Sequence, residues 1–228
     1  MIELIIPAYN EEAAIMEVVH GVPRGLVSRV IVVDNGSTDD TGRRAREAGA
    51  EVVREERRGY GSACLAGVRA LGDAEIVVFL DGDRSDDPNE ISMLVDLIIE
   101  DRADLVIGSR TSRMERGALT PQQLVGNRVA TALIRLLYGV RLSDIGSFRA
   151  IRRDALLSLG MSNLTYGWPV EMVVKASKRR YRIAEVPITY RRRIGKSKVG
   201  GTLAGSVLAG YHMLTTIVRY ALVQVPRS

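Results

Sequence analysis

The sequence predicts an α/β protein: a doubly wound, mostly parallel sheet with helices on both faces, followed by a C-terminal amphipathic helix. Three observations support this prediction. Short runs rich in Val and Ile alternate with helical patterns over the first hundred residues. Most of these runs lack polar alternation, which is typical of strands covered on both faces. The chain is 46% hydrophobic and 26% charged, so it can form a globular core.

The first half is expected to contain five strands separated by four helices. The strands are expected at 3–7, 29–34, 50–53, 75–81 and 103–108. The helices are expected at 11–20, 39–48, 60–71 and 88–100. Asp39 and Pro88 stand where capping and first-turn residues belong.

The pattern is looser after residue 119. A helix is expected at 122–139, closed by Gly139, and another at 168–179, with Pro169 in its first turn. Residues 181–193 are expected to be extended, and 202–223 to form the last helix.

The last helix is predicted to be amphipathic. Residues 199–218 carry no charged side chain, but Gly, Ser, Thr and His interrupt the apolar residues, which disfavours a membrane span. An apolar stripe repeats every three or four residues, formed by Leu203, Val207, Tyr211, Leu214, Val218 and Leu222. Core packing and contact with a membrane surface or partner both remain open for this stripe.

Charge is distributed unevenly along the chain. Residues 1–100 hold 20 acidic and 10 basic residues, whereas 101–228 hold 7 acidic and 22 basic ones. The window 175–198 contains 10 Lys or Arg and only Glu185 as an acid, which predicts attraction to anionic lipid. The single cysteine, Cys64, excludes an intramolecular disulfide and fits a reducing compartment. The N-terminus lacks the pattern of a signal peptide.

Four carboxylates follow one predicted strand in "VVFLDGDRSDDP" (77–88). Ligands bind outside the carboxyl ends of strands in open α/β sheets. In Asp81-Gly82-Asp83, both carboxylates can face the same side, as the oxygen ligands of a Mg²⁺ or Mn²⁺ ion that also holds a diphosphate. Asp86 and Asp87 have another interpretation, since acidic residues also suit the start of the next helix.

Several stretches resemble family 2 glycosyltransferases of the GT-A fold, of the dolichyl-phosphate mannosyltransferase and polyprenyl-phosphate glucosyltransferase types. The stretches are "IIPAYNEE" (5–12), "VVDNGSTDDT" (32–41), "LDGD" (80–83), "GSR" (108–110), "SDIGSFRAIRRDAL" (143–156) and "EVPITYRRRIGKSKVGG" (185–201). The resemblance implies a catalytic domain over 1–201, with a nucleotide-sugar half (1–110) and an acceptor half (111–201), and a separate helix in 202–228.

The resemblance also implies roles for individual residues. Those expected to bind the nucleotide sugar are Pro7, Tyr9 and Glu11 in the nucleotide pocket, Asp34 at the base, Asp81 near the ribose and diphosphate, and Arg193, Ser197 and Lys198 in a basic loop over the phosphates. Asp83, with Asp81, is expected to ligate the metal. Phosphate of donor or acceptor is expected to contact Arg110, Arg128 and Arg149, because arginine forks match phosphate oxygens.

The implied reaction moves a hexose from a UDP- or GDP-hexose to an acceptor, with inversion. A polyprenyl phosphate is the expected acceptor and needs no general base. A soluble hydroxyl acceptor is the alternative and needs a carboxylate, for which Glu171 is the first candidate and Asp144 the second. Glu171 has an equal alternative as a helix-surface or Arg-paired acid, and Trp168 and Tyr166 are either core residues or interfacial or sugar-stacking aromatics.

The expected protein is cytoplasmic, peripheral at the inner face of the membrane, with its oligomeric state open. Three departures from the family leave the exact donor and acceptor open: Asp34-Asn35 in place of two acids, Ser85 in place of Gln or His, and "GSFRA" in place of "SGFRA".

Two other classes fit less well. Sugar nucleotidyltransferases carry a glycine-rich basic loop after the first strand, where this chain has "PAYNEEAAI". An RNA- or membrane-binding module would leave the acidic cluster unexplained, and RNA surfaces usually interleave aromatics, which make up only 5% here. No nucleic-acid partner is therefore expected. The glycines of "GYGSACLAG" (59–67) do not follow a strand closely enough to predict a dinucleotide site.

Overall fold

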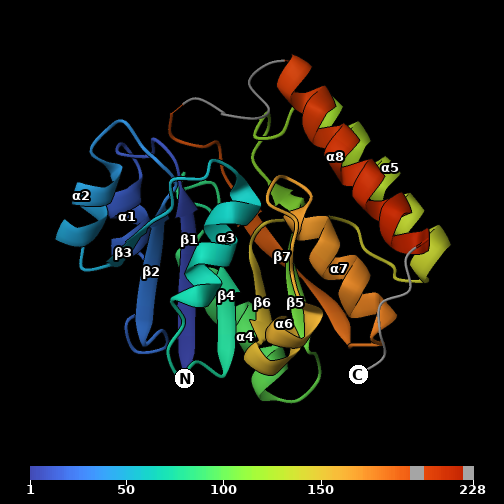
Figure 1. The fold of residues 1–228 in the computed structure, drawn as a ribbon, viewed down its shortest axis with the longest axis horizontal. Helices are drawn as coiled ribbons and strands as arrows, with labels where there is room; N and C mark the ends of the chain where they lie inside the picture. The colour runs from blue at the N-terminus through green and yellow to red at the C-terminus, as the bar shows by residue number, and fades with distance from the viewer. Residues whose placement is uncertain (196–202, 223–228) are drawn as a thin grey trace.

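The computed structural model describes residues 1–195 and 203–222, and in these the chain forms one seven-stranded sheet flanked by helices (Figure 1). The strand order is β3-β2-β1-β4-β6-β5-β7. The strands are β1 (Ile2–Ala8), β2 (Arg29–Asp34), β3 (Glu51–Arg54), β4 (Ile76–Phe79), β5 (Leu105–Met114), β6 (Arg149–Arg152) and β7 (Ile183–Tyr190). The predicted α/β class and the five predicted strands of the first half are confirmed.

The N-terminal half of the sheet is parallel. β1 pairs in parallel with β2 on one side and β4 on the other, and β3 extends the sheet beyond β2. β1, β2 and β4 are almost wholly buried on both faces, which explains their unalternating Val and Ile composition. The carboxyl ends of these three strands therefore lie next to one another, at the top of Figure 1.

The sequence analysis missed one strand. β6 lies between β4 and β5 and runs antiparallel to both, so β5 does not pair with β4 as a simple β-α-β order would suggest. β5 then pairs in parallel with β7, which forms the edge of the sheet. The extended segment predicted at 181–193 is this edge strand.

Helices cover both faces of the sheet, as predicted. One buried apolar cluster joins a face of the sheet to α1 (Ile15–His20), α2 (Thr41–Glu47) and α4 (Ile91–Ile99), which follows the short 3₁₀ turn η1 (Pro88–Glu90). A second cluster joins the other face to the remaining helices. These are α3 (Tyr60–Arg69), α5 (Pro121–Tyr138), α6 (Arg153–Leu159), α7 (Trp168–Lys178) and α8 (Leu203–Leu222).

α8 packs against α5 and α7 at the flank of the molecule (Figure 1). The Tyr138 hydroxyl donates to the Ile217 carbonyl at 2.5 Å, and Ile217 itself is fully buried. Of the predicted apolar stripe of α8, Tyr211 and Val218 are exposed, whereas Leu214 packs against the core. No helix in the described part of the chain is long and apolar enough to span a bilayer.

The glycines of 59–67 serve close packing. α3 begins where the chain passes the backbone of residues 163 and 164, and the Ser62 amide donates to the Leu164 carbonyl at 3.1 Å. A Cβ on Gly61 would lie 2.0 Å from the Asn163 carbonyl oxygen, so only glycine fits there.

We expect Gly61→Ala to lower the free energy of unfolding by about 1–3 kcal/mol, because the added methyl group forces two backbone segments apart. Urea unfolding monitored by circular dichroism measures this. Gly126→Ala in α5 is the matched control, since no atom lies within 4 Å of its added methyl group. The control should be neutral or stabilising by about 0.5–1 kcal/mol. Equal stability of the two variants would contradict the close packing.

Candidate active site

A cavity of about 710 Å³ lies at the carboxyl ends of β1, β2 and β4. Residues from each of these strand ends line it, including Pro7, Asn35 and Asp81. It extends between α5 and α8 on the other side, where Asn127 and His212 line it. The cavity thus spans the junction between the acidic and basic halves of the chain.

Asp81 and Asp83 both line this cavity at the end of β4. The Asp81 carboxylate accepts hydrogen bonds from Ser147 Oγ at 2.7 Å and from the Tyr60 hydroxyl at 3.3 Å. Burial, and then the Asp83 carboxylate, raise the pKa of Asp81. Asp83 accepts from Ser85 Oγ at 2.6 Å and forms an ion pair with Arg193, whose Nη1 lies 2.9 Å from Asp83 Oδ2.

Asp86 and Asp87 differ in environment. Asp87 accepts a hydrogen bond from the Asn89 amide and so caps η1, as one interpretation predicted. Asp86 caps nothing: it is buried, and neither of its carboxylate oxygens has a hydrogen-bond partner. Burial, with the nearby carboxylate of Asp81, raises its pKa well above the usual range. A third buried carboxyl therefore stands behind the Asp81–Asp83 pair.

These residues fit a hard divalent cation. Oxygen ligands clustered in a desolvated site repel one another unless a positive charge offsets them, and the guanidinium of Arg193 supplies that charge at Asp83. In the described part of the chain, no group of three or more candidate ligands is arranged to hold an ion alone. A cation held by Asp81 and Asp83 would therefore need further oxygens from substrate phosphates and water, which is typical of Mg²⁺ sites.

One side of the cavity is formed by the loops after β1, β2 and β3. Pro7, Tyr9 and Glu11 line the cavity there, and the guanidinium of Arg58 lies 3.0 Å from the centroid of the Tyr9 ring. Asp34 is buried beside this region but does not line the cavity; it accepts from the Ser37 amide at 2.8 Å and pairs with Arg54.

Asn35, which the prediction passed over, lines the cavity and holds the loop that carries Arg58. Its side-chain amide donates to the Arg57 carbonyl at 2.7 Å and accepts from the Gly59 amide at 2.8 Å. An aspartate at this position could not donate to that carbonyl. Asn35, which stands where many relatives have a second acid, therefore helps to shape the cavity wall.

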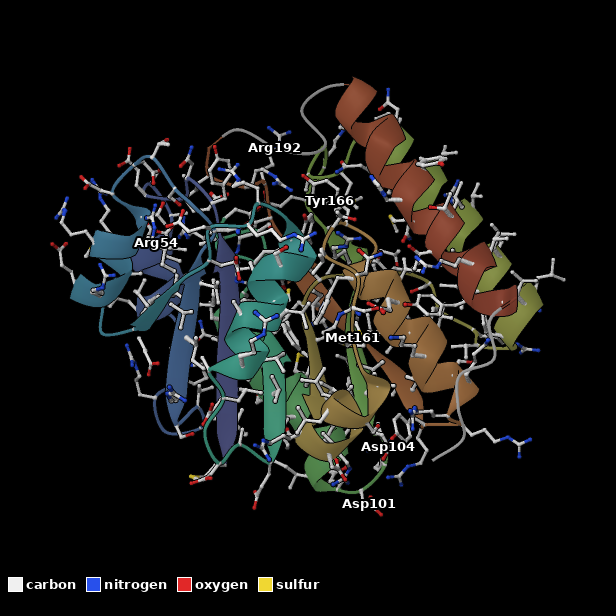
Figure 2. All side chains as sticks on the ribbon, in the orientation of Figure 1. Arg54, Asp101, Asp104, Met161, Tyr166 and Arg192 are labelled. Carbon is white, nitrogen blue, oxygen red and sulfur yellow. The ribbon has the colours of Figure 1, made fainter. Side chains whose placement is uncertain are left out.

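The other side of the cavity is more apolar and contains no carboxylate from the described residues. It is lined by Leu119, Gln122, Gln123, Gly126, Asn127, Ala130 and Ile145, by Thr165, Tyr166 and Pro169, and by Gly210, His212, Met213 and Leu214. Tyr166 lies near the upper end of the molecule in Figure 2, opposite the end that carries Asp101 and Asp104. Trp168, by contrast, is a core residue packed edge-on against Phe79.

The three arginines expected at phosphate lie in different surroundings. Arg110 lines the cavity, and its guanidinium forms a bidentate pair with the buried carboxylate of Asp144 at 2.6 and 2.7 Å. Arg128 is exposed on α5 and does not line the cavity. Arg149 is fully buried and donates to the carbonyls of Pro169 and Gly146, and burial lowers its pKa to about 10. Its surroundings are those of a structural residue.

The structure gives no support to the two proposed general bases. Glu171 is fully buried and does not line the cavity. Its carboxylate pairs with Lys175 Nζ at 2.7 Å and accepts from the Tyr220 hydroxyl at 2.6 Å, besides donors of Ser162 and Asn163. Burial raises the pKa of Glu171, but these donors together lower it by more than burial raises it, so the net shift of the pKa is downward. Glu171 is therefore an ion-paired acid, as one alternative predicted, but its partner is Lys175 and not an arginine. Asp144 is held in the same way by Arg110.

Of the predicted basic loop, the structure places Arg193 in the cavity wall, whereas Ser197 and Lys198 lie outside the described residues. Sequence reasoning missed Ser147, Arg58 and His212. Ser147 was visible in "GSFRA", where the exchanged Gly and Ser place a hydroxyl on Asp81. His212 carried no local signal, because only the packing of α8 brings it to the cavity.

Comparisons with known proteins agree with this geometry. The family description "Glycosyl transferase family 2" matches residues 3–160. An uncharacterized glycosyltransferase of Mycobacterium tuberculosis is 40% identical over 210 residues, covering 91% of this chain and 94% of that protein. A dolichyl-phosphate hexose transferase of Haloferax volcanii is 34% identical over 209 residues, covering 90% and 89%.

A solved structure also resembles the whole chain. The glucosyl-3-phosphoglycerate synthase of M. tuberculosis, crystallised with Mn²⁺, UDP-glucose and phosphoglyceric acid, superposes with a TM-score of 0.81 at 26% identity. The similarity covers 99% of this chain and 81% of that one. The GT-A architecture expected from the sequence is thereby confirmed.

Asp86 should make stability fall as pH rises. Its pKa is raised in the folded state, so the folded protein keeps a proton that the unfolded chain releases above about pH 4. The stabilisation is complete below the unfolded pKa and is lost as pH rises toward the folded one. Between about pH 5 and pH 8, we expect the free energy of unfolding to fall on the order of 1 kcal/mol more for the wild type than for Asp86→Asn, whose side chain cannot ionise.

Urea unfolding with a chelator present measures these slopes. Asp87→Asn is the matched control, because the interactions of Asp87 with Asn89 and Arg191 outweigh its burial and lower its pKa. The difference in the free energy of unfolding between Asp87→Asn and the wild type should therefore shrink only when the pH falls below about 4. Parallel pH profiles for wild type and Asp86→Asn would contradict a protonated Asp86.

Proposed function

The chain belongs to glycosyltransferase family 2, and from that premise we propose that it transfers a hexose from a UDP- or GDP-hexose to the phosphate of a polyprenyl phosphate. One observation carries the proposal: a single cavity joins the Asp81–Asp83 pair to a wall, formed by residues of α5, α8 and 165–169, in which the described residues place no carboxylate. A phosphate acceptor is already an anion and needs no base, whereas a hydroxyl acceptor usually does.

On the donor side, the nucleotide would lie between the loops after β1 and β2, near Tyr9, Arg58 and Asn35. Asp81 and Asp83 would hold Mg²⁺ or Mn²⁺, which when bound supplies positive charge to the leaving diphosphate. Arg193, which pairs with Asp83 in this structure, would turn to the donor phosphates when the nucleotide sugar binds, because its guanidinium fork matches their oxygens. The two charges would together stabilise the leaving group.

On the acceptor side, Arg110 lines the cavity and would bind the acceptor phosphate, because arginine forks match phosphate oxygens. Its pairing with Asp144 fixes the guanidinium, with the ring of Tyr190 about 5.1 Å from it. An acceptor phosphate held there would attack the anomeric carbon from the side opposite the diphosphate, and a single displacement of this kind inverts the configuration. We propose that the protein does this as a peripheral enzyme at the cytoplasmic face of a membrane.

A second candidate is a small soluble acceptor that carries a phosphate and a hydroxyl. The similarity to a synthase crystallised with phosphoglyceric acid favours it, and His212 in the cavity wall could take the hydroxyl proton. His212→Asn separates the two candidates, because it should slow transfer to a hydroxyl and leave transfer to a lipid phosphate nearly unchanged.

We expect Asp83→Ala to lower nucleotide release from the preferred donor at least about 100-fold, because it removes a metal ligand at the leaving group. A panel of UDP- and GDP-hexoses, assayed with and without Mn²⁺, identifies the donor and its metal dependence. Asp87→Ala is the matched control in the same loop, since Asp87 caps η1 and does not line the cavity.

The control should keep most of the activity, and circular dichroism should show both variants folded. Full activity of Asp83→Ala, or metal-independent release in the wild type, would remove the proposed role of this carboxylate pair.

A further inference from the structure

We propose that the outer face of the α5–α8 helix pair is the surface by which the protein docks on an anionic bilayer, with the acceptor entering the cavity from that side. The inference deepens the proposed function and rests on it only for the identity of the acceptor. It concerns four side chains of α5, Val125, Val129, Leu136 and Leu137, and two of α8, Tyr211 and Val218, which together are named the outer apolar face.

The outer apolar face concentrates exposed apolar surface. Six of the nine exposed large apolar side chains in the described residues belong to it, so they are clustered and not scattered. Leu136 is 78% exposed, and Tyr211 is 62% exposed. Val125, Val129 and Leu136 follow one another at helical spacing, on the side of α5 opposite the buried Ala130 and Ile134.

The charge of this surface fits an anionic partner. Neither α5 nor α8 contains an acidic residue. Arg128 and Arg135 flank the apolar stripe of α5, and Arg219 flanks that of α8. All three are exposed, and none forms an ion pair with a described residue. Apolar side chains flanked by arginines are typical of helices that lie in a membrane interface.

Four cations of the basic window predicted to contact lipid are weaker candidates for the same role. Lys175 is buried against Glu171, Arg191 pairs with Asp87, and Arg193 pairs with Asp83. Arg182 pairs with Asp101 and Asp104, which lie at the end of the molecule away from Tyr166 in Figure 2. These cations are therefore engaged within the protein, whereas those of α5 and α8 are not.

The position of the outer apolar face connects a bilayer to the cavity. α5 and α8 lie side by side (Figure 1), and both contribute to the cavity wall. Gly126 lines the cavity next to the exposed Val125, and Gly210 and His212 line it on either side of the exposed Tyr211. An apolar chain anchored in the bilayer could thus place its phosphate in the cavity without crossing water.

A second copy of this chain is the competing occupant. Two outer apolar faces packed on each other would bring arginines of like charge together with no acidic residue of α5 or α8 to offset them. An anionic headgroup layer offsets these charges, so the observations favour the bilayer.

Vesicle flotation tests the proposal. We expect the full chain to float with phosphatidylcholine vesicles that contain phosphatidylglycerol, more strongly at about 50 mM than at about 500 mM salt, and much less with phosphatidylcholine alone. Leu136→Ser with Tyr211→Ser should reduce the bound fraction at least about tenfold, because two large apolar side chains lose their burial. Arg135→Gln with Arg219→Gln should remove most of the dependence on phosphatidylglycerol.

Ile99→Ser is the matched control, since Ile99 is 60% exposed on α4, which covers the opposite face of the sheet. It should bind vesicles like the wild type. Nucleotide release from the soluble donor should be unchanged in all of these variants, and circular dichroism should show them folded. Absence of wild-type binding to the anionic vesicles, or equal binding by the Leu136→Ser, Tyr211→Ser variant, would overturn the proposal.

Light scattering after size-exclusion chromatography completes the test. A dimer that this double substitution dissociates, combined with no vesicle binding, would assign the face to a second copy and overturn the proposal. This test and the test of the proposed function can fail independently. Vesicle binding would persist even if the acceptor were soluble, and the nucleotide-release assay of Asp83→Ala contains no vesicles.

Discussion

Two carboxylates at the end of the central strand β4, Asp81 and Asp83, lie where water screens their charges poorly, so other parts of the molecule must offset this negative charge. Burial and the charges of these two groups raise the pKa of the nearby Asp86, which is buried. The compensating guanidinium groups come from distant segments: Arg110 from β5 and Arg193 from the chain just after β7. The acidic first half and the basic second half of the chain thus both contribute to the cavity wall.

The elements that could be predicted are those whose signal is local. β1, β2 and β4 are continuous Val and Ile runs because they are buried on both faces, and the Pro and Gly residues at the ends of α5 and α7 mark those ends directly. β6 carries no such signal. It contains two arginines in four residues, and Arg149 is acceptable in the core only because its guanidinium donates hydrogen bonds to the carbonyls of Gly146 and Pro169. The Pro169 contact is made across 20 residues of sequence.

The same distinction applies to the site. Asp81 and Asp83 were predictable because their spacing and the strand before them are local features. Glu171 was the first candidate for a base, but Lys175 stands four residues later, and a Glu–Lys pair at that spacing is a common helical ion pair. That both would be buried, and that Tyr220 would donate to the carboxylate, depends on α8. His212 and the exposure of Tyr211 depend on the packing of the same helix and were not visible in its periodicity.

The position of β6 has a consequence for how the chain acquires its structure during synthesis. When a ribosome has released the first 110 residues, β4 has β1 on one side, but its other edge has no partner until residues 149–152 emerge. β5 likewise waits for β6 and for β7. Residues 1–110 alone therefore leave the sheet incomplete, and the nascent protein exposes an open strand edge, which favours chaperone binding and aggregation, until well over half of it has been made.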